Sequence, residues 1–226
     1  MSDVMPGHLH GAPQPPATAQ VPAWRLISTL GVAGAVAGLL IVLVFQWAQP
    51  QILANQARAT ELAIAEVLSD GTRFQTLFVH QGALTEALPA GVDSVPLDKI
   101  YVGFDAADAR VGYALVHAEP GFADLVRVIF GYDSNTRSVL GMMVLENKET
   151  PGLGDKIVKD SAFVNGFRAR TVPLRGVKAG EGKGGADEVD MITGATISSR
   201  TVIAVINHRL ETMQPLIEAY ERRGTP

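Results

Sequence analysis

The sequence predicts an α+β protein in which a single N-terminal transmembrane helix precedes a compact domain of antiparallel sheet and flanking helices. Three observations lead to this prediction. Residues 26–48 form an uncharged apolar run, short runs rich in β-forming residues fill the middle of the chain, and apolar residues recur at helical spacing after Ser199. We expect four parts: a flexible tail (1–24), the transmembrane helix (25–48), a helical connector (49–72) and the domain (73–222).

Composition excludes several classes of function. The formal net charge is −4, and there is no run of Lys and Arg, so nucleic acid is not an expected partner. The chain contains no Cys, which excludes disulfides, thiolate nucleophiles and Cys-ligated clusters within it. We find no spacing typical of a metal site, a Ser-His-Asp triad or paired catalytic carboxylates, so we predict neither a catalytic group nor a metal ligand.

The first part of the chain is predicted to be an uncleaved membrane anchor. Residues 1–22 contain five prolines and no apolar period, which is typical of a flexible tail. The apolar run is flanked by Trp24 and Trp47, and at about 1.5 Å per residue its 23 residues span roughly 34 Å, enough for a bilayer core. A signal peptide would have a shorter apolar region and a small-residue cleavage site. Arg25 precedes the run and the next basic residue is Arg58, so the positive-inside bias places the tail in the cytoplasm and the domain outside it.

The segment after the span is predicted to be helical, and the chain then changes to a period of two. Pro50 follows the span, and Asp70-Gly71 is expected to end the connector helix. Turn residues separate the short β-forming runs, which predicts an antiparallel meander. The predicted strands are 74–80, 100–104, 112–117, 125–132 and 139–145.

Three further elements are predicted near the C-terminus. Residues 160–167 indicate a short helix capped by Asp160 or Ser161, and residues 171–178 and 188–192 indicate two strands. Between these strands, residues 180–185 are rich in Gly and are expected to form a hairpin loop.

A hydroxyl-rich turn precedes the last helix. Its sequence is Asp190-Met-Ile-Thr193-Gly194-Ala195-Thr196-Ile197-Ser198-Ser199. We expect this turn to lie at a strand-to-helix junction, with Ser198 or Ser199 as N-cap and Ile197 in the core. Gly194 is suited to a positive φ, and the free N–H groups of a helix start attract phosphate. An ordinary capped turn without any ligand remains an alternative for these residues taken alone.

A resemblance to a known family sharpens this prediction. The run Asp190-x-x-Thr193-Gly194-Ala195-Thr196 resembles the motif of FMN-binding domains that hold flavin covalently, and Glu149-Thr150-Pro151-Gly152-Leu153-Gly154 resembles a second block of those domains. The resemblance implies that the phosphate of FMN is esterified to Thr196, with Thr193, Gly194, Ala195, Asp190 and Ser198 around it. It also implies that Glu149, Thr150, Gly152 and Leu153 border the flavin ring.

Two such blocks behind one membrane span resemble the G subunit of Rnf-type electron-transport complexes. The resemblance implies a membrane-anchored flavoprotein of the bacterial inner membrane that relays electrons within an ion-translocating complex rather than acting as a stand-alone enzyme. It further implies other membrane subunits as partners and a flavin transferase for maturation. The alternatives are the C subunit of the sodium-pumping NADH:quinone reductase, which has the same domain, and an anchored scaffold domain without flavin.

Overall fold

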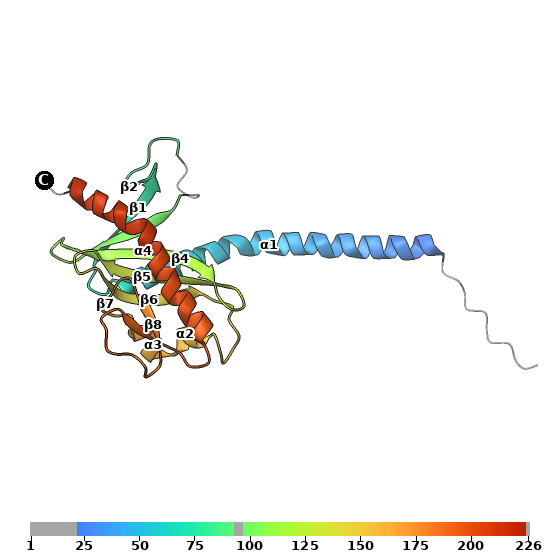
Figure 1. Ribbon diagram of the computed structural model, residues 1–226. Helices are drawn as coiled ribbons and strands as arrows, with labels where there is room; N and C mark the ends of the chain where they lie inside the picture. The colour runs from blue at the N-terminus through green and yellow to red at the C-terminus, as the bar shows by residue number, and fades with distance from the viewer. Residues whose placement is uncertain (1–21, 93–96, 225–226) are drawn as a thin grey trace, which may run out of the picture. The chain divides into compact units, whose positions relative to one another are not determined.

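A computed structural model describes residues 22–92 and 97–224 and divides the chain into two units, one ending at Leu53 and the other beginning at Ala54. The predicted flexible tail lies, up to residue 21, outside the described residues. The first unit consists of the apolar part of helix α1 (Ala23–Val67), which is the one helix among the described residues that is long and apolar enough to cross a membrane (Figure 1). Its large side chains, from Trp24 to Trp47, are at least half exposed, as expected for a segment without protein neighbours.

Helix α1 is longer than the predicted anchor. The sequence predicts a span and a separate connector, but the structure has one helix of 45 residues that runs through Pro50 and ends at Val67. Proline interrupts the hydrogen bonding of a helix without always ending it. The part of α1 from Ala54 to Val67 belongs to the second unit, where Ala63, Ile64 and Val67 are buried.

The second unit is built on the predicted antiparallel meander. Its seven-stranded sheet has the order β2-β1-β3-β4-β5-β6-β7, and each neighbouring pair is antiparallel. The strands are β1 (Arg73–His80), β2 (Ala83–Thr85), β3 (Lys99–Phe104), β4 (Arg110–Pro120), β5 (Leu125–Asp133), β6 (Ser138–Glu146) and β7 (Arg170–Thr171). The five predicted strands are present, and β2 and β7 are short additions at the two edges.

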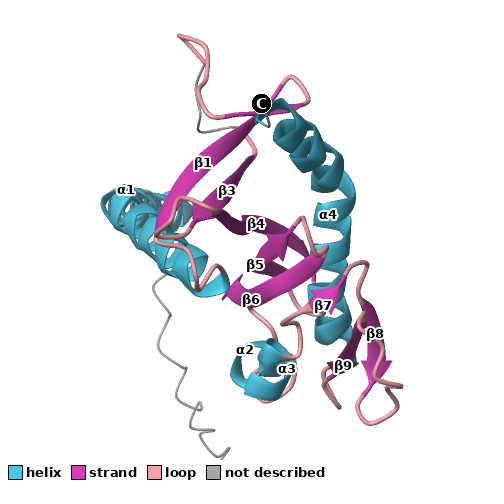
Figure 2. Cartoon of the chain, turned by 90° about the vertical axis from the view of Figure 1, so that its left-hand side faces the viewer, coloured by secondary structure: helices cyan, strands magenta, loops and turns pink. Residues whose placement is uncertain are grey.

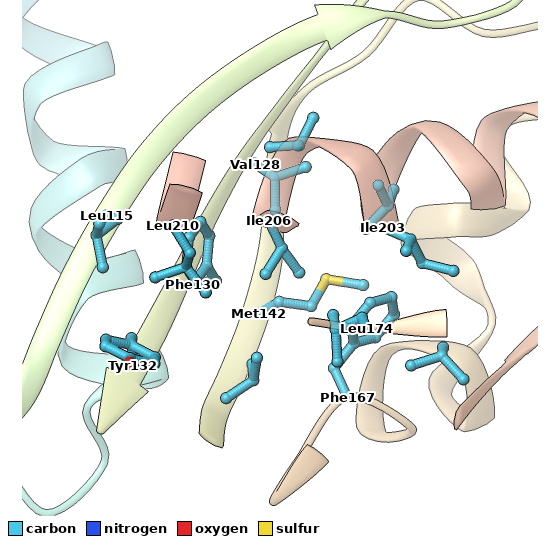
Figure 3. Close-up of a cluster of buried hydrophobic side chains, with 14 of the residues drawn as sticks. Leu115, Val128, Phe130, Tyr132, Met142, Phe167, Leu174, Ile203, Ile206 and Leu210 are labelled. Carbon is cyan, nitrogen blue, oxygen red and sulfur yellow. The ribbon is translucent and has the colours of Figure 1, made fainter. Parts of the chain in front are cut away.

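Side chains alternate between the two faces of the sheet. On β4 and β5, Leu115 and Phe130 point into the main core, whereas Ala114 and Ile129 point to the opposite face and pack against the end of α1. Helix α4 (Thr196–Gly224) covers the main-core face with Ile203, Ile206 and Leu210 (Figures 2 and 3). The observed architecture therefore confirms the predicted α+β class.

The segment between β6 and α4 departs from the prediction in two respects. The predicted strand 171–178 is divided into β7 and β8 (Arg175–Lys178), separated by a cis Val172–Pro173 bond. Strand β8 pairs in parallel with β9 (Glu188–Met191), so the expected hairpin at residues 180–185 is wrong. The loop instead returns to the start of the next strand, and Glu188 holds it by accepting hydrogen bonds from the N–H groups of Lys183 (2.7 Å) and Gly185 (3.2 Å).

Two short helices precede β7. Helix α3 (Ser161–Asn165) matches the predicted one, and Asp160 is its N-cap because its carboxylate accepts from the N–H groups of Ala162 and Phe163. Helix α2 (Lys156–Lys159) was not predicted from the sequence. Both helices follow the Glu149–Gly154 block and lead the chain back to the sheet.

Candidate functional site

The hydroxyl-rich turn connects β9 to α4, as predicted. Gly194 has a φ of +82°, and α4 begins at Thr196 itself. The N–H groups of Thr196, Ile197 and Ser198 therefore have no acceptor one turn earlier in the helix, whereas Ser199 N donates to Ala195 O at 2.9 Å. The side chain of Thr196 is half-buried, and its hydroxyl makes no hydrogen bond with the described residues.

Neither serine of the motif serves as the N-cap. The predicted capping role of Ser198 and Ser199 is wrong because the helix starts two residues earlier, and both side chains are buried within its first turn. Ser199 Oγ accepts a hydrogen bond from Ile192 N at 3.1 Å and so ties the turn to the strand end. Ser198 Oγ donates to Glu149 Oε2 at 2.8 Å.

The Glu149–Gly154 block forms a tight turn beside α4. Leu153 N donates to Thr150 O at 3.1 Å across Pro151 and Gly152, and Gly152 has a φ of +79°, as a type II turn requires. Asp155 Oδ1 accepts from Gly152 N at 2.7 Å and so holds the turn in place. The ammonium group of Lys159, together with the Gly152 N–H, lowers the pKa of the Asp155 carboxyl against the opposing effect of burial.

The two sequence blocks meet around one cavity of about 320 Å³. From the first block come Glu149, Thr150, Leu153 and Gly154, and from the second come Gly194, Ala195, Thr196, Ile197 and Ser198. Phe122, from the loop between β4 and β5, supplies a third wall. A cavity of this size lies at the lower end of the range of small-molecule sites, about 300–1,000 Å³.

The rim of the cavity is apolar and open to solvent. The exposed fractions of Phe122, Leu153 and Ile197 are 67%, 52% and 52%. The prediction that Ile197 enters the core is therefore wrong, because its position in the first turn of α4 directs it to the cavity instead. Exposed side chains of this kind, gathered on a cavity beside free N–H groups, suit a flat ligand that has a charged end.

Three of the predicted site residues lie apart from this cavity. Asp190 and Thr193 line a separate groove together with Lys156, Asp160 and Arg170, and Gly152 is absent from the cavity wall. The turn at Gly194 separates the two sets because it reverses the direction of the chain between Thr193 and Thr196. The structure thus brings together seven of the ten predicted residues.

Sequence reasoning missed Phe122 and Gly154. Gly154 allows the turn to approach Glu149, since a Cβ atom there would lie 2.4 Å from Glu149 Oε2 and 2.8 Å from Ser198 Oγ. Its place in the second motif is a signal that could have found it. Phe122 offers a weaker signal, an exposed aromatic residue in the short loop between two predicted strands.

Comparison with known proteins gives the class of the domain. Residues 121–211 match the family model described as FMN-binding domain, and this segment contains both blocks and the Phe122 loop. The fold resembles the crystal structure of NqrC from Shewanella oneidensis, with a TM-score of 0.54, 17% identity and coverage of 68% of this chain and 87% of that one. It also resembles the C subunit of a Na⁺-translocating NADH-quinone reductase from Parabacteroides distasonis, with a TM-score of 0.50, 23% identity and coverage of 62% and 75%. Residues 121–211 are therefore similar to an FMN-binding domain.

The relatives in sequence are more particular. The chain is similar to the G subunit of the ion-translocating oxidoreductase complex of Methanosarcina acetivorans, with 28% identity over 83% of this chain and 92% of that protein. It is similar to the protein of the same name from Shewanella loihica, with 27% identity over 81% and 85%. It is also similar to the protein of that name from Haemophilus influenzae, with 34% identity over 48% of this chain and 56% of that protein. These matches confirm the resemblance to the G subunit that the two motifs predicted.

Proposed function

We propose that this chain is a membrane-anchored flavoprotein subunit that relays electrons within an ion-translocating complex of the Rnf type, with FMN joined through its phosphate to Thr196. The observation that supports this most strongly is the single cavity at which both motif blocks meet, inside the segment that matches an FMN-binding domain. Flavin supplies the electron-transfer chemistry when bound, and the protein supplies binding, orientation and electrostatics.

The residues around the cavity fit both ends of FMN. Thr196 Oγ1 places a phosphoester at the start of α4, where the N–H groups of residues 196–198 and the positive end of the helix dipole favour an anion. Leu153, Ile197 and Phe122 offer apolar contacts to a flat ring system. Thr150 and backbone N–H groups are the candidates for its polar edge.

Attachment of FMN requires an external enzyme. A Thr hydroxyl is a weak nucleophile unless a base activates it, and no described residue hydrogen-bonds the Thr196 hydroxyl. We therefore propose that a flavin transferase loads the site during maturation. Asp190 and Thr193 line the neighbouring groove and are available for recognition by that enzyme.

The anchor defines the setting of this domain. Helix α1 has the length and composition of a membrane span, and Arg25 precedes its apolar run. We propose a single-pass protein of the bacterial inner membrane, with the tail in the cytoplasm, the domain on the extracytoplasmic side and other membrane subunits as partners. The C subunit of the NADH-quinone reductase shares the fold, but the similarity in sequence to the G subunit, at 27–28% identity over 81–83% of this chain, favours the Rnf-type assignment.

The test is the mass and colour of the purified chain. Protein made in cells that contain the transferase should stay yellow after denaturation and gel filtration, and the peptide spanning residues 191–200 should be heavier by one FMN less one water. Thr196→Ala should abolish the added mass, whereas Thr193→Ala, a matched loss of a Thr hydroxyl outside the cavity, should reduce the added mass without moving it. Flavin lost on denaturation, or mass added to Ser198 or Ser199, would contradict the assignment. A wild-type chain without visible absorbance would instead support the scaffold alternative.

A further inference from the structure

Glu149 is a buried acid whose carboxylate accepts hydrogen bonds from the loop of Phe122 and from the first turn of α4. Its Oε1 accepts from Phe122 N (2.8 Å) and Ala123 N (3.2 Å), and its Oε2 accepts from Ser198 Oγ (2.8 Å). The residue is 5% exposed, and no Lys, Arg or His among the described residues forms an ion pair with it. Both of its carboxylate oxygens thus already accept hydrogen bonds from protein groups.

We propose that Glu149 is a positioning residue that holds three separate segments in the arrangement the flavin site needs. This inference rests on the proposed function of the cavity. The segments are the loop that presents Phe122, the turn that presents Leu153, and the first turn of α4, which presents Thr196. Glu149 acts through these segments. It is hydrogen-bonded to the loop of Phe122 and to the first turn of α4, and it is the residue directly before the turn that presents Leu153.

The backbone of two glycines packs closely against the carboxylate of Glu149. A Cβ atom at Gly121 would lie 2.2 Å from Oε1, and one at Gly154 would lie 2.4 Å from Oε2. Removing the carboxylate would leave two N–H groups and a hydroxyl without their acceptor. Such unsatisfied groups are unfavourable, so the loop and the helix start should move apart to reach water.

The hydrogen-bonding pattern provides a conservative variant that separates geometry from charge. A Gln side chain at position 149 can accept from both N–H groups with Oε1 and donate to Ser198 Oγ with Nε2. Glu149→Gln should therefore preserve the arrangement, whereas Glu149→Ala removes all three bonds. Ser198→Ala removes only the bond to the helix and should give an intermediate result.

Glu188 is a matched control elsewhere in the same unit. It is also 5% exposed, it accepts from the N–H groups of Lys183 and Gly185, and it pairs with Arg175 at 2.6 Å. It does not line the cavity that contains Thr196. Glu188→Ala therefore removes a comparable buried carboxylate without touching the three segments.

The experiment uses the full-length chain in detergent, made with and without the flavin transferase. Amide hydrogen exchange of the flavin-free protein at residues 122, 123 and 199, whose N–H groups are hydrogen-bonded, and the time course of FMN per chain by intact mass are measured for each variant. Because three hydrogen bonds are lost together, Glu149→Ala should accelerate exchange and reduce the rate of FMN incorporation by about tenfold or more. Glu149→Gln should stay within about twofold of wild type, and Glu188→Ala should load normally even if its Tm falls.

Several outcomes would overturn the proposal. They are unchanged exchange and loading in Glu149→Ala, an equal loss of loading in Glu188→Ala, or a failure of Glu149→Gln to restore loading. If Glu149→Ala does not fold, normal loading of Ser198→Ala would count against the proposal. A wild-type chain that carries no FMN on Thr196 would contradict the proposed function instead, and the exchange measurements on flavin-free protein would still test Glu149.

Discussion

Gly154 shows at the scale of single residues how closely the two motif blocks are fitted together. Its Cα lies where any Cβ would meet Glu149 Oε2 at 2.4 Å and Ser198 Oγ at 2.8 Å. Gly154→Ala should therefore push these side chains apart, lower stability by about 1–3 kcal/mol and reduce FMN incorporation. Gly141→Ala is the matched control, because its new Cβ would meet only Val67 atoms at 3.8–3.9 Å. Thermal unfolding and intact mass of both variants provide the measurement, and equal effects at the two positions would contradict the fit described here.

Individual residues of the site could be predicted only where a local pattern identifies them. Gly194 and the turn at Pro151-Gly152 follow from local turn chemistry, which depends on neighbouring residues alone. The partner of Glu149 is Ser198, 49 residues further along the chain, and no local pattern reveals such a pair. Ile197 was misplaced for a related reason, since the register of α4 decides which side of the helix it occupies.

At the scale of elements, the first half of α1 presents a surface suited to close packing. A Cβ at Gly34 or Gly38 would meet nothing within 4 Å, and the large side chains around them are exposed. Small residues four apart allow membrane helices to approach closely. Replacing both glycines by Leu should weaken co-purification with the other subunits while leaving the FMN content intact. A loss of co-purification could not be attributed to a less stable helix, because Leu forms helices more readily than Gly.

The control for this face is the neighbouring pair Ala33 and Ala37, which has the same spacing on an adjacent side of the helix. Changing both of these to Leu should affect assembly less. Unchanged co-purification of the Gly34/Gly38 double variant, measured by pull-down of the complex, would assign this face to lipid.

Helix α4 is tied to the start of β3 by an ion pair whose strength depends on pH. Arg209, which is buried, donates to both oxygens of Asp98, at 2.6 and 2.7 Å. Burial alone would raise the pKa of Asp98, but the hydrogen bonds and charge of Arg209, with the Lys99 N–H and the His117 charge, bring the pKa below its usual value. The stabilisation is therefore complete above the unfolded pKa of about 3.9 and is lost as the pH falls through the lower folded value.

The Asp98→Asn variant tests this dependence. At neutral pH it should lower the free energy of unfolding by about 1–3 kcal/mol, because Arg209 keeps only neutral partners. The difference between wild type and variant, measured by denaturant unfolding of the flavin-free protein, should shrink steadily below about pH 4. A difference that stays constant between about pH 2 and pH 5 would show that the pair does not contribute in this way.

The helices and strands that depend mainly on local sequence could be predicted, and those that depend on distant contacts could not. The strands of the meander are bounded by turn residues, and α4 has a clear helical period, so both follow from the sequence. The parallel pairing of β8 with β9 does not, because residues 180–185 have the Gly content of a hairpin turn. What selects the observed path is the capture of the Lys183 and Gly185 N–H groups by Glu188. The continuity of α1 through Pro50 was missed because Pro usually marks a helix end.

At the scale of the whole molecule, the proposed electron relay depends on which side of the membrane the domain occupies. The two ends of the span differ in charge. Arg25 lies directly before it, whereas no Lys or Arg follows until Arg58. Since positive residues are retained on the cytoplasmic side, the domain should be extracytoplasmic. Electrons would then reach the flavin through neighbouring subunits, because the described residues provide one span only.

The absence of Cys from the sequence makes this orientation directly measurable. Lys183 lies in an exposed part of the Gly-rich loop, so Lys183→Cys places a single reactive thiol on the domain, and Ser2→Cys places one in the tail. A membrane-impermeant maleimide added to intact spheroplasts should label the first variant at once and the second only after permeabilisation. FMN content and intact mass of both variants confirm that the substitutions leave the protein assembled. The reverse labelling pattern would put the domain in the cytoplasm, and the flavin would then face the cytoplasmic partners of the complex.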